Sequence, residues 1–330
     1  MLNAATWTTR LNELAAKARV PGATLGIWSG GQEILVAHGV LNTATEVPVT
    51  PDSLFQVGSI TKIWTATMIM QLIDEGRLSL DAAVAQVLPD ARLGAADVGD
   101  QVTVRHLLTH TSGIDGDIFT DTGRGDECVR RYVRLLGQAP SVFAPGAAYS
   151  AIGLGWRLSR WGGRTIIGHD GDTIGQSAYL RIDQAAGVAA CLLTNAAESE
   201  TLYRELFDEV FGTLTGVTMP GPPRPAAWAP GAVDLGRYTG HYERASRRFD
   251  VSVRDGRLRM ELTMTGNLAG LIAAEPEDLL LYPAGPFDSA GARFVLRSRE
   301  DEPWVPLSFG QFGDGRPYLY VSGRVTPRVG

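Results

Sequence analysis

The sequence predicts an α+β fold, in which an antiparallel sheet of about five strands is flanked by helices and followed by a small β-barrel. Three observations predict this fold. A hairpin pattern occupies residues 23–38, three alternating segments lie between residues 164 and 195, and short strand-like segments bounded by Gly, Asp or Pro fill residues 232–330. The length of 330 residues suggests two domains, at roughly 150 residues per domain.

The N-terminal segment predicts a helix followed by a hairpin. Residues 7–19 place Leu11, Leu14, Ala15 and Ala18 on one helical face, and this helix ends before Pro21. Two short apolar runs follow at residues 23–28 and 32–38, separated by Ser-Gly-Gly at 29–31, which is typical of a β-hairpin. We expect the helix to pack on the sheet that this hairpin begins.

Residues 60–75 predict a second helix that is apolar on most of its circumference and capped by Gly76. A helix of this kind is expected to be buried. Residues 81–88 and 104–109 predict two further short helices, whereas residues 113–127, rich in Asp, Gly and Thr, predict a loop.

The next region completes the predicted sheet. Residues 165–168, 177–182 and 188–193 alternate as three strands, with a turn at 183–187 between the last two. Residues 198–214 then form an amphipathic pattern. We expect helices 7–19 and 198–214 on one face of the sheet and the buried helix 60–75 on the other.

A proline-rich segment, residues 217–231, separates two predicted domains, 1–216 and 232–330. The second domain is expected to be a β-barrel of lipocalin-like appearance. Its expected role is to cap the site or to pair subunits, so a homo-oligomer is one expectation.

Composition excludes several classes of function. Thirty basic and 36 acidic side chains give a net charge of −6, which argues against nucleic-acid or anionic-lipid partners. No stretch approaches the ~20 apolar residues of a membrane span. Cys128 and Cys191 form no zinc or disulfide pattern, and the N-terminus lacks the features of a secretory signal, so we expect a cytoplasmic protein.

The segment Phe55-Gln-Val-Gly-Ser-Ile-Thr-Lys62 carries the strongest chemical pattern. Ser59 and Lys62 are three positions apart, so on a helix the ammonium can reach the hydroxyl. A serine needs such a neighbour to become a nucleophile, and a lysine in a dry pocket can lose its proton. The alternative is a helix-capping serine beside a lysine that extends into solvent, and the spacing alone leaves both open.

Three further motifs favour the catalytic role of Ser59 and Lys62, because together with the Ser59 segment they resemble the motifs of a known family. They read Val-Arg-His-Leu-Leu-Thr-His-Thr-Ser-Gly at 104–113, Phe-Ala-Pro-Gly-Ala-Ala-Tyr-Ser at 143–150 and Gly-His-Asp-Gly-Asp-Thr-Ile-Gly at 168–175. With the Ser59 segment, and in this order, the chain resembles the penicillin-recognising serine hydrolases. That family includes class C β-lactamases, D-alanyl-D-alanine carboxypeptidases and related esterases. The resemblance covers about residues 5 to 215, and the C-terminal part resembles the β-barrel often appended to these enzymes.

The resemblance implies a role for each matching residue. Ser59 matches the acylated nucleophile, Lys62 the lysine that assists proton removal, and Tyr149 the tyrosine that relays the proton to the leaving group. His169-Asp170-Gly171 matches the Lys-Thr-Gly strand that binds substrate, where His169 stabilises the tetrahedral intermediate or orients a substrate carboxylate. The oxyanion hole is expected at the backbone N–H groups of Ser59 and Asp172. Structural roles stay open as alternatives for two of these residues. Tyr149 would then be an ordinary loop residue, and His169 would be a strand residue that hydrogen-bonds to Asp170.

Two departures from the family pattern follow. The Tyr-x-Asn element reads Tyr149-Ser150-Ala151, and only 20 positions separate Tyr149 from His169, where relatives insert a long helical segment. Most of the helical subdomain is therefore expected to be absent.

We expect a serine hydrolase that needs no metal or organic cofactor and acts on a small-molecule or short-peptide substrate: an ester, an amide or a D-amino-acid peptide. The replaced Lys-Thr-Gly and missing Asn disfavour β-lactams. A binding or scaffold relative without turnover and an acyltransferase to a small metabolite are the alternatives.

Overall fold

The computed structural model describes residues 2–94, 96–116, 118, 120–148, 150, 152–227, 233–271, 276–285, 292–300 and 303–330. The chain divides into two compact units. Unit 1 comprises residues 1–78 and 151–221, and unit 2 comprises residues 79–150 and 222–330. The domain boundaries 1–216, 217–231 and 232–330 stay a prediction.

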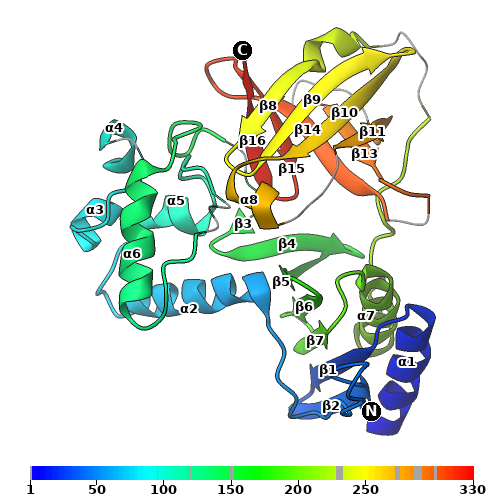
Figure 1. Ribbon diagram of the computed structural model, residues 1–330. Helices are drawn as coiled ribbons and strands as arrows, with labels where there is room; N and C mark the ends of the chain where they lie inside the picture. Colours follow the sequence, from blue (N-terminus) through cyan, green and yellow to red (C-terminus); the bar gives the residue numbers. More distant parts are fainter. Residues whose placement is uncertain are drawn as a thin grey trace. The chain divides into compact units, whose positions relative to one another are not determined.

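Unit 1 is built on a seven-stranded antiparallel sheet with the order β2-β1-β7-β6-β5-β4-β3 (Figure 1). The predicted hairpin and three strands are confirmed, but the expected strand number of five is too low. Sequence analysis missed β3 and β4, and it ended β5 at Gly168 although the strand runs five residues further. The strands are β1 (Gly22–Ser29), β2 (Gln32–Gly39), β3 (Ile152–Gly153), β4 (Trp156–Trp161), β5 (Arg164–Thr173), β6 (Gln176–Asp183) and β7 (Val188–Thr194).

Two helices cover one face of this sheet, as expected. They are α1 (Ala4–Lys17), which begins where the Asn3 side chain accepts hydrogen bonds from the N–H groups of Ala5 and Thr6, and α7 (Glu200–Thr215). Their apolar stripes meet the sheet in one core, where Leu11, Phe207 and Leu192 are fully buried. Burial of such side chains contributes ~1.5–3 kcal/mol each, so this core supports the sheet from behind.

The opposite face carries the short 3₁₀ turn η1 (Gly58–Ile60) and the helix α2 (Thr61–Asp74). Ile60 and Ile63 pack against Ala178 of β6 and fix the start of the helix on the sheet. The expectation that α2 is buried nearly all round is wrong, because Trp64 is 67% and Met68 56% exposed. The sheet contacts only one side of the helix, and an apolar sequence does not itself supply a second layer.

Unit 2 combines short helices with a nine-stranded, nearly closed barrel-like sheet (Figure 1). The strand order is β11-β10-β9-β8-β16-β15-β14-β13-β12. The edge strands β11 and β12 are separated only by Leu281, so residues 277–283 pair with β10 on one side and β13 on the other. This segment brings the two edges of the sheet together.

The elements of unit 2 confirm the predicted strand-rich C-terminal region. Its helical elements are α3 (Val84–Val87), α4 (Ala96–Gly99), α5 (Val104–Leu108), α6 (Glu127–Leu135), η2 (Leu136–Gln138), η3 (Leu235–Tyr238) and α8 (Gly266–Leu271). Its strands are β8 (Gly240–Arg244), β9 (Arg247–Arg254), β10 (Arg257–Met264), β11 (Glu277–Leu280), β12 (Tyr282–Pro283), β13 (Ala292–Leu296), β14 (Val305–Gln311), β15 (Pro317–Val321) and β16 (Arg324–Val329).

The segment 79–150 is tied to the barrel by apolar and polar contacts. Phe143 and Ala148 share a buried cluster with Phe312 and Tyr318, and the Phe143 and Phe312 ring centroids lie 5.5 Å apart. The buried Asp115 carboxylate accepts a hydrogen bond of 2.5 Å from the N–H of Ala245. These contacts hold two distant parts of the sequence in one unit.

Candidate active site

The predicted nucleophile and its lysine are in contact. Lys62 Nζ donates a hydrogen bond of 2.7 Å to Ser59 Oγ, because η1 continues directly into α2 and sets the two side chains one turn apart. Ser59 is half-buried and Lys62 is exposed, so the described residues do not form the dry lysine pocket that sequence analysis expected. The lysine therefore contacts the serine from a solvent-exposed position.

Strand β5 reaches this serine because it is longer than its neighbour β4. Pairing with β4 stops at Gly168, which leaves residues 169–173 bordered on that side by η1 rather than by a strand. Two glycines allow the close approach. A Cβ on Gly171 would lie 2.0 Å from the Val57 carbonyl oxygen, and one on Gly58, whose φ is +50°, would lie 2.8 Å from Asp172 N.

The same approach brings together the two N–H groups predicted to form the oxyanion hole. The space that a Gly171 side chain would occupy lies 3.0 Å from Ser59 N, and Asp172 N faces Gly58. Asp172 is paired with Ser177 of β6, and partial desolvation raises the pKa of its carboxyl above the usual value although the residue is exposed. Its side chain lies on the face of the strand opposite to His169 and Gly171, so Asp172 can offer only its backbone to the site.

His169 lies on the same face of the sheet as Ser59. It pairs with Leu180 of β6, whose side chain packs with Ile60 and Ile63 at the start of α2. Its Nδ1 donates a hydrogen bond of 2.5 Å to the carbonyl of Asp170, because a carbonyl can only accept. Burial lowers the pKa of the imidazole below its usual value. A neutral His169 therefore carries its proton on Nδ1 and has a free lone pair on Nε2.

Asp170 points the other way, since successive side chains of a strand face opposite sides of a sheet. Its carboxylate is held by Arg157 of β4 and Arg181 of β6, each at 2.7 Å. The side chain of Asp170, predicted to bind substrate together with Gly171, thus supports the strand from behind. Sequence analysis missed both arginines. A hairpin register centred on the turn at Gly175 places Arg181 opposite Gly168 and would have indicated this second arginine.

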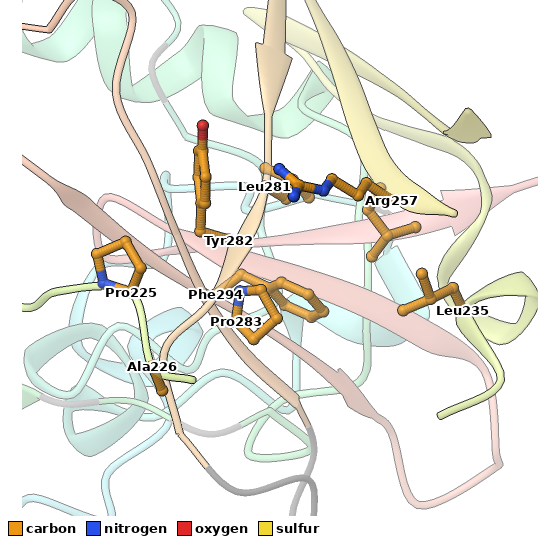
Figure 2. A pocket seen from close by; sticks show the side chains of 9 residues that line it. Pro225, Ala226, Leu235, Arg257, Leu281, Tyr282, Pro283 and Phe294 are labelled. Carbon is orange, nitrogen blue, oxygen red and sulfur yellow. The ribbon is translucent and has the colours of Figure 1, made fainter. Parts of the chain in front are cut away.

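Tyr149 and Ala151, from the predicted Tyr-x-Asn element, lie outside the described residues. Unit 2 contains a pocket of about 150 Å³ whose lining includes Leu258, Leu281 and Phe294 and none of the predicted site residues. Figure 2 shows Leu281, Phe294 and Arg257 around this pocket. Within the ranges given above, no group of three or more His, Cys, Asp or Glu side chains is arranged to hold a metal ion.

Comparison with known proteins shows the family to which the chain belongs. The β-lactamase family model matches residues 7–153, a span that includes Ser59 and Lys62. Penicillin-binding protein 4 of Amycolatopsis lactamdurans is 30% identical over 370 residues, covering 72% of this chain and 97% of that protein. The chain belongs to the penicillin-recognising serine hydrolase family. The alignment is longer than this whole chain, so part of the relative has no counterpart here. That this part is the helical subdomain stays a prediction.

Other members of the family extend the comparison. Esterase EstB of Burkholderia gladioli is 34% identical over 178 residues, which cover 48% of this chain and 43% of the esterase. A crystal structure of SurE with D-Leu matches with a TM-score of 0.76 at 22% identity, over 98% of this chain and 99% of that one, and shows the shared fold. Relatives in the penicillin-recognising serine hydrolase family include esterases and β-lactamases. None of the helices in the described ranges is long and apolar enough to cross a bilayer.

Proposed function

We propose that this protein is a serine hydrolase that forms an acyl-enzyme at Ser59 and acts on an ester, an amide or a D-amino-acid peptide. The observation that carries the proposal is the 2.7 Å hydrogen bond between Lys62 Nζ and Ser59 Oγ, formed beside the glycine-lined backbone of β5. A nucleophile, a proton-transfer group and two backbone donors within one small region are the parts that acyl transfer requires.

In the proposed acylation step, the Lys62 ammonium first gives up a proton to solvent, and Ser59 Oγ then attacks the substrate carbonyl carbon as its own proton passes to the neutral amine. The carbonyl oxygen becomes an oxyanion and is stabilised by the N–H groups of Ser59 and Asp172. Collapse of this intermediate breaks the bond to the leaving group, which takes up a proton. Water then attacks the ester at Ser59, releases the acid and restores the serine.

His169 is proposed to assist as a neutral group. Burial keeps the imidazole unprotonated near pH 7, and the Nδ1 bond to the Asp170 carbonyl leaves Nε2 as a hydrogen-bond acceptor. Such a group can accept a proton or bind an N–H or O–H of the substrate. A neutral His169 is poorly suited to the charge-based binding of a substrate carboxylate that the Lys-Thr-Gly lysine would offer.

D-Amino-acid derivatives are the substrates to screen first, alongside short-chain esters. The relatives are named as a penicillin-binding protein and an esterase, and the SurE structure contains D-leucine. The half-buried Ser59 and exposed Lys62 leave room for a second reactant, so acyl transfer to a small acceptor uses the same residues. Homo-oligomer assembly and a cytoplasmic location stay predictions.

The deciding experiment is reaction of the purified protein with a fluorophosphonate probe and with a penicillin, read by intact mass. We expect one adduct per chain, located at Ser59 by peptide mapping and absent from Ser59→Ala. No adduct on wild-type protein with intact circular dichroism would contradict the proposal and favour a binding relative that has lost turnover. A product that appears only when an amine or alcohol acceptor is added would instead indicate the acyltransferase.

A further inference from the structure

An ion-paired cluster lies behind β5, on the face turned away from Ser59. Arg157 NH1 donates a hydrogen bond of 2.7 Å to Asp170 Oδ2, and Arg181 NH1 lies 2.7 Å from Asp170 Oδ1. We propose that these three residues, the arginine clamp, position β5 for the reaction at Ser59. This inference rests on the proposed function and assigns positioning residues to it.

The register of three strands makes the clamp possible. Arg157 of β4, Gly168 of β5 and Arg181 of β6 lie side by side in one row across the sheet. Gly168 has no side chain, and a Cβ there would lie 3.0 Å from Arg181 Cδ. Both arginines can therefore extend over the empty position and reach Asp170, which is the next residue of β5 on the same face.

Arg181 is itself held firmly. Its side chain is only 9% exposed and donates hydrogen bonds to the carbonyls of Leu180 at 2.8 Å and His169 at 3.4 Å. The guanidinium lies 5.0 Å from the ring centroid of Tyr203, which stacks on Tyr179 with a centroid distance of 4.2 Å. Tyr203 belongs to α7, so the clamp connects β5 to the helix layer behind it.

The clamp acts on the site through the backbone of Asp170. The carbonyl of this residue accepts the His169 Nδ1 hydrogen bond, and the next residue, Gly171, packs against Val57 and Ser59. Removing one partner from a buried charge pair leaves an uncompensated charge, which the structure relieves by moving or admitting water. Movement of Asp170 shifts both His169 and the oxyanion donor relative to Ser59.

Two charges of the clamp also affect the pKa of the His169 imidazole, and they shift it in opposite directions. The Asp170 carboxylate raises the pKa of His169, whereas the Arg157 guanidinium lowers it. Neutralising Asp170 and neutralising Arg157 should therefore move the His169 titration in opposite directions. Opposite shifts would show that both charges act on His169, and the Ser59 labelling rate then tests whether the clamp positions β5.

The test compares Asp170→Asn, Arg157→Gln, Arg181→Met and Arg181→Lys with a matched control, Arg164→Gln. Arg164 makes the same kind of ion pair, 2.8 Å to the fully buried Asp183, at the opposite end of β5. One readout is the NMR titration of the His169 ring, assigned with His169→Gln. The other is the labelling of Ser59 by the fluorophosphonate, separated into its maximal rate constant and its half-saturating concentration.

We expect the His169 titration to move to lower pH in Asp170→Asn and to higher pH in Arg157→Gln. In Asp170→Asn and Arg181→Met the maximal labelling rate should fall at least ~10-fold, the usual effect of a misplaced reacting group, with little change in half-saturation. Arg181→Lys should recover part of that rate, and Arg164→Gln should match the wild type in both readouts.

The proposal that the clamp positions β5 would be overturned by His169 titration shifts of the same sign in Asp170→Asn and Arg157→Gln. It would also be overturned if the clamp variants labelled Ser59 as fast as Arg164→Gln does. If Asp170→Asn does not fold, Arg157→Gln still decides, because Arg157 is half-exposed and its loss leaves Arg181 on the carboxylate. An unlabelled wild type would mean that the proposed function, and with it the catalytic role of the clamp, has failed. The titration then reports separately whether the three residues control His169.

Discussion

Gly171 lies so close to Val57 that a β-carbon on the glycine would be 2.0 Å from the valine carbonyl oxygen. No side chain fits this distance without displacing backbone. The contact places the strand that carries His169 directly against the turn that carries Ser59. The arrangement of the site thus depends on backbone packing as much as on the reactive side chains.

Gly171→Ala should therefore separate β5 from Ser59 and weaken the oxyanion hole. We expect the rate of fluorophosphonate labelling to fall by about 100-fold or more, the usual cost of losing one oxyanion donor. Gly212→Ala is the matched control, because this exposed helical glycine of α7 has open space around its α-carbon. A wild-type labelling rate in Gly171→Ala would contradict the close packing described here.

Contacts within one helical turn can be predicted from the sequence, whereas contacts that depend on the register of several strands are harder to predict. The contact between Ser59 and Lys62 was predictable, since it needs only one helical turn. The ion pairs of Asp170 with Arg157 and Arg181 were not predicted, because they depend on the register of three strands and on an empty position at Gly168. Sequence alone predicted the contact between Ser59 and Lys62 and missed the two arginines that hold Asp170.

The outer surface of α2 shows the same limit. Trp64 and Met68 belong to an apolar pattern that predicts burial, but a pattern does not reveal whether a covering layer exists. Whether these side chains are buried was decided by tertiary neighbours.

The two lysines of the chain provide a clean test of the proton-transfer group. Lys62→Arg keeps the positive charge but cannot release its proton, so the labelling rate at Ser59 should fall by ~10²–10⁴-fold. Lys17→Arg should have no effect, because Lys17 lies on the surface and pairs with Glu205 at 2.8 Å. We expect unchanged melting temperatures for both variants. Equal labelling rates in wild type and Lys62→Arg would argue against proton removal by this lysine.

Burial of His169 should make the stability of the protein depend on pH. The folded-state pKa lies below the unfolded value of about 6.5, so the unfolded chain binds the proton first as the pH falls. The free energy of unfolding should decrease below about pH 6.5 and level off below the folded-state pKa. Urea denaturation between about pH 8 and 5 should show a smaller decrease for His169→Gln than for the wild type. Equal decreases would mean that His169 titrates normally.

The contact of Phe143 with Phe312 should be needed for the stability of unit 2. Phe143→Ala removes a buried ring and should destabilise this unit by ~3–5 kcal/mol. Hydrogen exchange read by mass spectrometry should rise in β15 and stay unchanged in β6. Val129→Ala, at a 64% exposed position of α6, is the control. Unchanged exchange in β15 would show that the segment 79–150 does not support the barrel.

The pairing of β1 with β7 has a consequence for how the protein is made. Ala23 is paired with Thr194, so the early hairpin cannot enter the finished sheet until the ribosome has translated residue 194. During that interval one edge of β1 has free N–H and C=O groups that can pair with another nascent chain. Pairing between nascent chains through this edge is therefore expected to compete with folding until β7 has been translated.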